Sequence, residues 1–314
     1  MRSLVKIAVA LALTVAAGRA VYVAADPEKL DIDQAVRASA PGQFVRLGDG
    51  YTHFEVGGPP GGQVVVLAAG VSVPYYIWDP TFAALVGAGF RVLRYDYYGR
   101  GYSDRPDIAY TQDAYVRQLT ELLEALHITE PIDLAGLSFG GSVVTSFADR
   151  HPAAVRSLVF IDPSFRSPYS VGFVVQRPRL WDALTAVFEE RWWADRQLED
   201  FYRPERFPDW PSRYAVQIQY RGFRRAQRST VVSNATEDQG PQLKRVGAHP
   251  RPVLAFWGKE DVAVPLEFSA TLLEAMPHAR LVAVESAGHL PHWEQPDIVH
   301  PELIAFLRQS VKAS

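Results

Sequence analysis

Ser138 stands in the segment GLSFGG, where Gly136, Gly140 and Gly141 surround it. A serine hydroxyl is a weak nucleophile unless a base removes its proton and hydrogen-bond donors stabilise the oxyanion that forms. The G-x-S-x-G pattern alone arises by chance in about one chain in ten of this length, since glycine and serine each make up roughly 7% of residues. A catalytic serine here therefore needs a base, an acid and a supporting local structure elsewhere in the chain.

Two later segments supply the required partners. Asp261 lies in WGKEDVAVP and His289 lies in GHLPHWEQP, so the chain order is serine, aspartate, histidine. Each of the three residues follows an apolar segment typical of a buried strand, and parallel strands bring their carboxyl ends to one edge of a sheet. A lone acid is usually a solvated loop residue or a helix cap, and a lone histidine a loop residue. The three together, at successive strand ends, favour a catalytic triad.

The segments around these residues predict the elements that position them. Short segments rich in valine, isoleucine and leucine alternate with helical stretches, which is typical of a parallel sheet covered on both faces. The fold class is therefore α/β. The predicted strands lie near residues 43–47, 52–56, 63–69, 90–97, 132–136, 155–162, 252–258 and 279–285.

Two predicted helices connect these strands. Residues 114–128 place Val116, Leu119, Leu122, Leu123 and Leu126 on one face. The residues after Ser138 also predict a helix, so the serine lies at a tight turn from strand to helix. The N-terminus of that helix offers unpaired N–H groups and a partial positive charge, both of which favour an oxyanion.

The composition changes in the middle of the chain. Between about Ser164 and Arg245 there are four of the seven tryptophans and many arginines, but no buried-strand segment. We expect a helical insertion over residues 164–247, between core regions 26–163 and 248–314. Its aromatic side chains either face the substrate as a lid or pack the insertion against the core. Its arginines at positions 221, 224, 225 and 228 are expected to form an exposed cationic face.

The overall composition limits the classes of function that the chain can have. With 48% hydrophobic residues among 314, the chain has ample material for a buried core. The 32 basic and 35 acidic residues give a net charge of −3, so nothing indicates a nucleic-acid partner. The absence of cysteine excludes disulfides, thiolate metal sites and cysteine nucleophiles. The histidines and acids show no ligand spacing such as H-E-x-x-H, so we expect no metal and no cofactor.

The first 25 residues have the order of a secretory signal peptide. Arg2 and Lys6 precede an apolar segment at residues 7–17, and small residues end the segment at Ala25. If it is not cleaved, the same segment would serve as a membrane anchor. We expect export to the periplasm or the medium with cleavage near Ala25, or else membrane association through the N-terminus.

From about Val45 to Phe306 the chain resembles the α/β-hydrolase superfamily, in particular its serine hydrolases that carry a cap. The resemblance depends on four ordered motifs: YDYYGRGYSDRP, GLSFGG, WGKEDVAVP and GHLPHWEQP. It implies an eight-stranded, mostly parallel sheet with helices on both faces and the insertion as the cap. It also implies Ser138 as nucleophile, His289 as general base and acid, and Asp261 as the residue that holds the imidazole.

The resemblance implies further site residues and shows one departure. Some relatives place the triad acid at the end of the sixth strand, where this chain has Asp162 as the alternative acid. The oxyanion donors carry over to the backbone N–H groups of Val71 and Phe139. In VLAAGVSVP, Ala69 replaces the histidine that relatives usually carry. The loop then needs another brace, for which the Ser72 hydroxyl is a candidate, since losing one oxyanion donor costs about 3 kcal/mol.

A triad of this kind performs acyl transfer, and with water as acceptor it hydrolyses an ester, thioester, amide or lactone. We expect a serine esterase, lipase-like, that acts on a small-molecule ester with an apolar acyl group. Relatives that cleave carbon–carbon bonds, cofactor-free haloperoxidases and acyltransferases share the triad and remain alternatives. A different class of alternative is a binding module or receptor on the same fold. Ser138 argues against epoxide hydrolases and haloalkane dehalogenases, which use an aspartate at this position.

Overall fold

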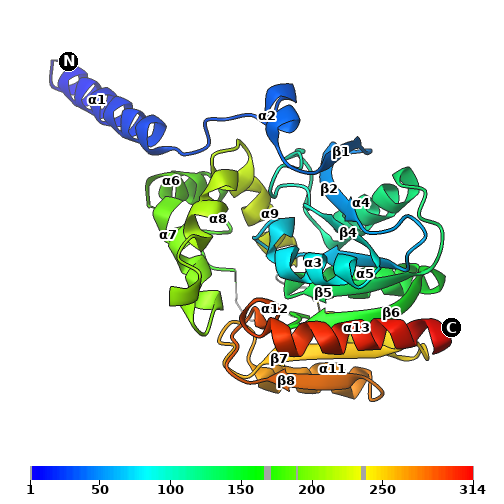
Figure 1. Cartoon of the computed structure of the whole chain (residues 1–314). Coiled ribbons are helices and arrows are strands. Elements are labelled where there is room, and N and C mark those ends of the chain that lie inside the picture. The colour runs from blue at the N-terminus through cyan, green and yellow to red at the C-terminus, as the bar shows by residue number, and fades with distance from the viewer. Residues whose placement is uncertain (1, 166–170, 189, 235–237, 314) are drawn as a thin grey trace.

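A computed structural model describes residues 2–165, 171–188, 190–234 and 238–313 of the chain (Figure 1). Its strands are β1 (Gln43–Arg46), β2 (Tyr51–Gly57), β3 (Val64–Ala68), β4 (Arg91–Tyr95), β5 (Ile132–Leu137), β6 (Val155–Ile161), β7 (Val253–Gly258) and β8 (Arg280–Val284). Within the described residues these eight strands form one sheet in the order β1-β2-β4-β3-β5-β6-β7-β8. Each strand falls on one of the predicted apolar segments, so the predicted eight-stranded α/β sheet is confirmed.

The direction of the strands decides where the loops meet. β1 pairs antiparallel with β2, and β2 pairs antiparallel with β4. From β4 through β3, β5, β6 and β7 to β8 every pair is parallel. The segments that follow β3, β5, β6, β7 and β8 therefore leave the sheet at the same edge. The order of the strands reverses between β3 and β5, and such switch points are where open α/β sheets form ligand crevices.

Helices cover the sheet because its central strands are apolar on both faces. All five residues of β3 and all six of β5 are buried. The helix α3 (Asp79–Gly87) packs against α13 (Pro296–Ala313), and α4 (Gln112–Ala125) packs against α5 (Phe139–Arg150). The remaining helices of the core are α2 (Gln34–Ser39), α11 (Ser269–Ala275) and α12 (Pro291–Glu294), with 3-10 turns at Tyr75–Trp78, Pro152–Ala154 and Leu266–Phe268.

The helix α4 has the buried face that its apolar periodicity predicts. Val116, Leu119, Leu122 and Leu123 are buried, as their shared face predicts. The helix begins after Thr111, whose side chain accepts the N–H of Ala114 as an N-cap. Leu126, the fifth residue predicted on this face, lies just beyond the last helical turn and is only partly buried.

Between β6 and β7 the chain forms a group of helices, here called the insertion. It contains α6 (Pro178–Phe188), α7 (Glu190–Arg196), α8 (Trp210–Ile218), α9 (Phe223–Asn234) and α10 (Gly240–Gly247), with 3-10 turns η3 (Gln197–Asp200) and η4 (Pro204–Arg206). α7 packs against α8 and α6 against α9, whereas α10 packs onto α5 of the core. Of the predicted range 164–247, residues 166–170, 189 and 235–237 lie outside the described residues.

The N-terminal helix α1 (Arg2–Ala25) projects from the body, and it packs against α6 of the insertion (Figure 1). Among the described residues, no helix combines the length and the hydropathy that crossing a bilayer requires. Directly after α1, Asp26 accepts a hydrogen bond from Arg224 at 2.7 Å, and Glu28 accepts the N–H groups of Gly222 and Arg224 at 2.7 and 2.6 Å. The segment after residue 25 is thus fastened to the insertion through its own side chains.

The arginines of the insertion do not form a free cationic face. Arg221 pairs with Asp31 and Arg225 pairs with Asp107, each at 2.5 Å. Arg228 donates to the carbonyl oxygen of Val175 at 2.7 Å. The expected cationic face is therefore neutralised by acids from other segments or bound to backbone carbonyls.

Candidate active site

Ser138 occupies the sharp turn between β5 and α5, with φ 53° and ψ −121°. A non-glycine residue at such a positive φ is strained, so the surrounding structure must hold it in place. A Cβ on Gly136 would lie 2.5 Å from the carbonyl oxygen of Gly140, and a Cβ on Gly140 would lie 2.4 Å from that of Ala68. The glycines around Ser138 therefore allow strand, helix and the end of β3 to approach closely, as a nucleophile elbow requires.

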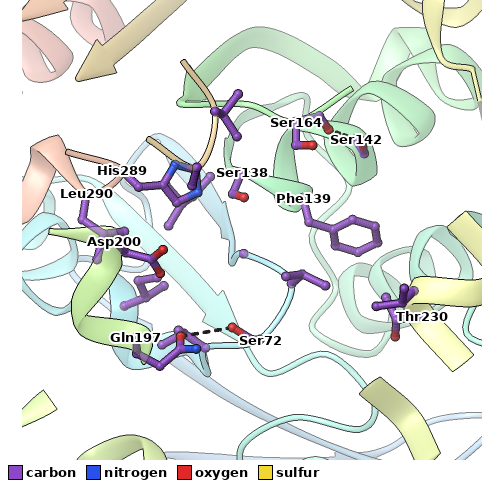
Figure 2. A pocket seen from close by; sticks show the side chains of 18 of the residues that line it. Ser72, Ser138, Phe139, Ser142, Ser164, Gln197, Asp200, Thr230, His289 and Leu290 are labelled. Carbon is purple, nitrogen blue, oxygen red and sulfur yellow. Dashed lines mark hydrogen bonds between the residues drawn. The ribbon is translucent and has the colours of Figure 1, made fainter. Parts of the chain in front are cut away.

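His289 and Asp261 reach the same sheet edge from the loops after β8 and β7. The His289 Nδ1 and Asp261 Oδ2 atoms are 2.7 Å apart. The other carboxylate oxygen of Asp261 accepts the N–H groups of Ala263 and Val264 at 2.8 and 2.9 Å. Because Asp261 accepts from Nδ1, the imidazole carries its proton there and keeps Nε2 as the basic nitrogen. Figure 2 shows the Ser138 hydroxyl beside the His289 ring.

The electrostatics of this pair favour charge separation. Burial disfavours the imidazolium, but the Asp261 carboxylate outweighs burial and raises the pKa of His289 above its ordinary value. Burial also opposes the charge on Asp261, yet His289 and the Val264 N–H together lower the pKa of Asp261 below its usual range. Asp261 is therefore ionised at neutral pH and stabilises a proton that His289 takes up.

Asp162, the alternative acid, lies at the end of β6 beside Asp261. Its Oδ1 atom accepts the N–H of Gly258 at 2.9 Å. Burial and then the Asp261 charge raise the pKa of Asp162 well above its usual range. The Oδ2 atom of Asp162 is buried and has no hydrogen-bond partner among the described residues. A carboxylate oxygen of Asp162, one of Asp261 and a ring nitrogen of His289 lie within 4.8 Å of one another. Of the two acids, Asp261 makes the hydrogen bond to the imidazole.

The two expected oxyanion donors lie at the same place. Val71 and Phe139 both line the cavity that contains Ser138. Phe139 is the first residue of α5, so its N–H has no acceptor within the helix and lies at the positive end of the helix dipole. The arrangement suits a negative charge that forms next to the serine oxygen.

The loop after β3 is braced without an imidazole. Arg100 donates from Nε to the carbonyl oxygen of Val71 at 2.7 Å, and Gln217 of α8 donates to that of Ser72 at 2.8 Å. The Ser72 hydroxyl, expected as a substitute brace, donates to Gln197 of η3 at 3.2 Å. Two of these three bonds come from the insertion, which thereby helps to fix the candidate oxyanion hole.

A cavity of about 470 Å³ contains Ser138 and His289 in its wall (Figure 2). This volume falls within the roughly 300–1,000 Å³ of typical small-molecule sites. The insertion contributes one wall, which includes Trp193, Gln197, Asp200 and Thr230. The core contributes the other, which is largely apolar and includes Val71, Val73, Ile77, Leu137, Phe139 and Leu290.

The tryptophans of the insertion divide between the two expected roles. Trp193 lines the cavity, whereas Trp181 and Trp210 are buried among other side chains. The side chain of Trp192 lies outside the described residues. Trp210 makes an edge contact with Trp293 of α12, with the ring centroids 5.0 Å apart, so it packs the insertion onto the core.

Glu294 links the loop that carries His289 to the insertion. Its carboxylate accepts the N–H groups of Gly288 at 2.7 Å, Arg203 at 2.9 Å and Tyr202 at 3.1 Å. Gly288 directly precedes His289, so these bonds hold the position of the imidazole. Glu294 therefore positions the loop rather than taking part in chemistry.

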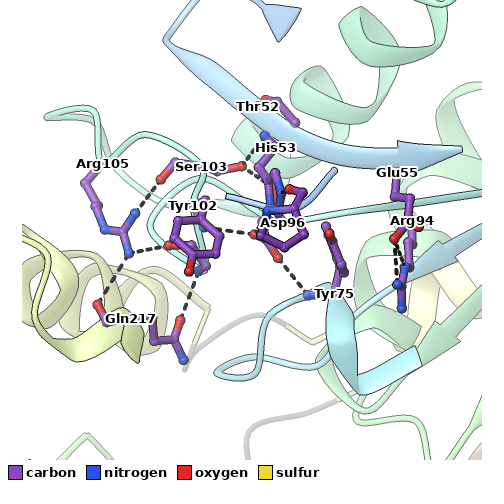
Figure 3. Close-up of polar contacts among 12 residues, drawn as sticks. Thr52, His53, Glu55, Tyr75, Arg94, Asp96, Tyr102, Ser103, Arg105 and Gln217 are labelled. Atoms are coloured by element: carbon purple, nitrogen blue, oxygen red, sulfur yellow. Dashed lines mark hydrogen bonds and ion pairs between the residues drawn. The ribbon is translucent and has the colours of Figure 1, made fainter. Parts of the chain in front are cut away.

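A second aspartate–histidine pair, His53 with Asp96, is buried and does not line this cavity; Figure 3 shows its polar contacts. The His53 Nδ1 and Asp96 Oδ2 atoms are 2.7 Å apart, and His53 Nε2 is 2.5 Å from the carbonyl oxygen of Pro41. Asp96 also accepts the N–H groups of Tyr75 at 2.7 Å and Tyr102 at 2.9 Å. Both ring nitrogens of His53 face acceptors, so this pair ties loops together and offers no free base.

Sequence reasoning did not find Asp200, Gln217 or Arg100. The backbone carbonyl of Asp200 accepts the N–H of His289 at 2.8 Å, and its side chain lines the cavity. Arg100 lies within the motif YDYYGRGYSDRP, but the motif did not indicate its bond to Val71. Asp200 and Gln217 lie outside the four motifs, and only the folded insertion brings them to the sheet edge.

Comparisons with known proteins identify the family and the fold. A family model described as "Alpha/beta hydrolase family" matches residues 65–302. The chain is 32% identical to the 2-hydroxymuconate semialdehyde hydrolase of Pseudomonas putida over 236 residues, which cover 71% of this chain and 77% of that protein. It is 25% identical to Lipase 3 of Moraxella sp. over 211 residues, which cover 65% and 64% of the two chains. The structure of an enol-lactonase from Burkholderia xenovorans is similar with a TM-score of 0.73 at 24% identity, covering 85% of this chain and 100% of that one.

Proposed function

Because the chain belongs to the alpha/beta hydrolase family, we propose that it is a serine hydrolase that cleaves a carboxylic ester through an acyl-enzyme. The observation that carries this proposal is the 2.7 Å contact between His289 Nδ1 and Asp261 Oδ2 in the wall of a cavity that Ser138 shares. A serine with a base and an oriented acid performs acyl transfer, and esters react with a serine nucleophile more readily than amides do.

Each residue has one role in this mechanism. Ser138 attacks the ester carbonyl while His289 accepts its proton at Nε2, and Asp261 stabilises the imidazolium that forms. The N–H groups of Val71 and Phe139 donate to the oxyanion of the tetrahedral intermediate. His289 then gives its proton to the leaving alcohol. Water, activated by the same imidazole, hydrolyses the acyl-enzyme and regenerates the serine.

The lining of the cavity supports a small substrate with an apolar group near the ester. The core wall is built mainly from aliphatic and aromatic side chains, and Trp193 adds an aromatic surface from the insertion. Apolar walls with a few polar groups are typical of sites that bind small molecules. In this proposal the insertion acts as a cap that closes the cavity over the triad.

A second candidate is the hydrolysis of a carbon–carbon bond by the same three residues. The 32% identity to a 2-hydroxymuconate semialdehyde hydrolase favours this candidate. Haloperoxidase-like and acyltransferase activities use the same triad with a different acceptor. Turnover of simple esters at high rates, with only slow turnover of a carbon–carbon substrate, separates the first candidate from the second.

We also propose that the protein is exported through its N-terminal segment. Lys6 and Arg19 are exposed on α1, and the bonds from Asp26 and Glu28 to the insertion would survive cleavage after Ala25. Cell fractionation followed by N-terminal sequencing tests this proposal. A mature chain that starts near residue 26 is the expected result, and a cytoplasmic chain that retains residues 1–25 would contradict it.

The test of the proposed function is a screen of p-nitrophenyl esters from acetyl to palmitoyl, with lactones and amides beside them. We expect multiple turnovers on at least one ester, together with a fluorophosphonate adduct that mass spectrometry places on Ser138. Labelling of Ser138 without multiple turnover of any substrate would instead support a binding module. Turnover that is unchanged in Ser138→Ala would overturn the proposal.

A further inference from the structure

Asp200 is an acid in the wall of the reaction cavity that the proposed mechanism does not use. It ends the turn η3 of the insertion, and its carbonyl oxygen accepts the N–H of His289 at 2.8 Å. Its side chain lines the same cavity as Ser138 and His289. Figure 2 shows its carboxyl group directed into the cavity below the His289 ring.

The carboxyl group of Asp200 lacks a partner of its own. Among the residues that the structure describes, neither of its oxygens has a hydrogen bond or an ion pair within the chain. Burial raises the pKa of Asp200 to about 6, and the nearby His289 opposes that rise. The Asp200 side chain is partly exposed and lines the cavity, so a substrate that fills the cavity would displace the water around its carboxyl group. A substrate that brings its own hydrogen-bond donor replaces that water, whereas one without a donor leaves the carboxyl group without a partner.

The charges near Asp200 come from two sides of the cavity. His289 and Asp261 face it from the sheet edge, and Glu199 and Arg196 face it from its own side of the cavity. Arg196 and Glu199 pair with each other at 3.3 Å, with side chains 50% and 64% exposed, so they lie at the outer mouth. Asp200 is therefore the acid that a bound substrate meets next to the reacting centre.

We propose that Asp200 is a specificity-determining residue that binds a hydrogen-bond donor of the substrate, a hydroxyl or an ammonium group, and disfavours substrates with a carboxylate near the ester. The inference rests on the proposed ester hydrolysis and names the substrate class. An ionised carboxylate attracts a cation and accepts a hydroxyl hydrogen, whereas it repels another carboxylate. The substrate is then an ester whose acyl group is apolar along most of its length and carries one donor.

The experiment uses four ethyl esters of nearly equal size. Ethyl butyrate is the apolar reference, ethyl 3-hydroxypropionate adds a hydroxyl, ethyl β-alaninate adds an ammonium group, and monoethyl succinate adds a carboxylate. The full chain hydrolyses each ester, and released ethanol gives kcat/KM. We expect the hydroxyl and ammonium esters to exceed the succinate ester by about tenfold or more, the size of one charge interaction in a partly buried site.

Asp200→Asn is the decisive variant, because asparagine has the same shape without the charge. We expect it to reduce the ratio of kcat/KM between the ammonium and succinate esters by about tenfold or more. Asp195→Asn is the matched control, since Asp195 is an exposed acid on α7 of the same insertion and does not line the cavity. It makes the same change in net charge and should leave the ratio within about twofold.

Two different failures are distinguishable. If the wild-type protein hydrolyses the esters but Asp200→Asn keeps the wild-type ratio, or if the succinate ester is the best substrate, the inference is wrong and the proposed function stands. If Ser138 reacts with a fluorophosphonate but none of the four esters is hydrolysed, the triad stands and the inference is overturned. If Ser138 does not react and no ester is hydrolysed, the proposed function fails as well.

Discussion

Two buried aspartate–histidine pairs in this molecule have the same contact geometry and different surroundings. In each, a histidine Nδ1 lies 2.7 Å from an aspartate Oδ2: His289 with Asp261, and His53 with Asp96. The second nitrogen of His53 is engaged by a backbone carbonyl, whereas His289 stands in the wall of a cavity beside Ser138. The contact alone therefore does not make a catalytic base. What the other ring nitrogen faces decides whether the pair moves protons or holds loops.

The two pairs are also joined through the insertion. Gln217 accepts the N–H of Gly101, in the loop that Asp96 organises, at 3.0 Å, and it donates to the carbonyl oxygen of Ser72 at 2.8 Å. Asp96 accepts the N–H of Tyr75 at the far end of the same loop after β3. The structural pair thus supports the loop that carries one of the candidate oxyanion donors, and the reacting pair depends on that loop.

The largest difference is expected between two single variants that carry the same substitution, one at His289 and one at His53. His289→Asn should lower kcat/KM for an ester by about 10⁴-fold or more, as should Ser138→Ala, because triad members act as a unit. His53→Asn should keep kcat within about tenfold but reduce the free energy of unfolding by about 3 kcal/mol, since Asp96 loses its buried partner. Ester kinetics and thermal unfolding of the three variants measure this. Equal losses of activity at both histidines would end the distinction between the pairs.

The next effect separates the two acids at the sheet edge. Asp261→Asn should lower kcat by about 10⁴-fold with little change in Tm, because the amide stabilises the wrong tautomer of His289. Asp162→Asn should cost less than about tenfold, since the amide oxygen can still accept the N–H of Gly258 and the contact between His289 and Asp261 is kept.

The pH dependence of both variants supplies the control. The raised pKa of His289 depends mainly on Asp261, so the acidic limb of the ester pH–rate profile should move to lower pH in Asp261→Asn. The same limb should stay in place in Asp162→Asn. A reversal of the two results would show that Asp162 is the triad acid.

A smaller effect is expected from the link between the two regions. Gln217→Leu removes the bonds to Ser72 and Gly101 without touching the triad. We expect kcat to fall about tenfold with KM nearly unchanged, less than the roughly 100-fold that follows the loss of an oxyanion donor itself. Gln219→Leu, at an exposed position at the end of the same helix, is the control. If both variants keep the wild-type kcat, the insertion does not brace the oxyanion loop.

The pH also sharpens the role of Asp200, whose pKa burial raises to about 6. The carboxyl group is charged above that pKa, so the preference for the ammonium ester over the succinate ester is present there and is lost as the pH falls through it. Between about pH 7.5 and about pH 5.5 the ratio of kcat/KM should fall about threefold. The protonation of His289 affects both esters and cancels in the ratio. The ratio in Asp200→Asn should be independent of pH over this interval.

The smallest effect on activity is expected at Ala69, which is 1% exposed in the core. Ala69→His should not raise kcat, because Arg100, Gln217 and Gln197 already brace the following loop. Inserting an imidazole at this packed position should instead lower the free energy of unfolding by about 1–3 kcal/mol. A clear rise in kcat would show that the loop is underbraced after all.

The sequence by itself predicted the eight strands, the mostly parallel sheet that they form, and the three candidate triad residues at its edge. Apolar segments of strand length report burial on both faces directly, and the glycines around Ser138 report a turn that a Cβ would block. Asp261 and His289 stood out because each follows such a strand, and parallel strands end at one edge. These are local patterns, so no knowledge of distant packing was needed to find them.

Only the tertiary structure decided which groups surround that edge and in which protonation state. The sequence did not indicate that His53 and Asp96 form a second pair, nor that a backbone carbonyl engages the other ring nitrogen of His53, because packing brings these groups together. The pKa of Asp162 is raised because burial and the Asp261 charge act on the same carboxyl group, and desolvation depends on every element that excludes water. Asp200 and Gln217 reach the cavity through the folded insertion, whose helices pack by contacts between segments far apart in the chain.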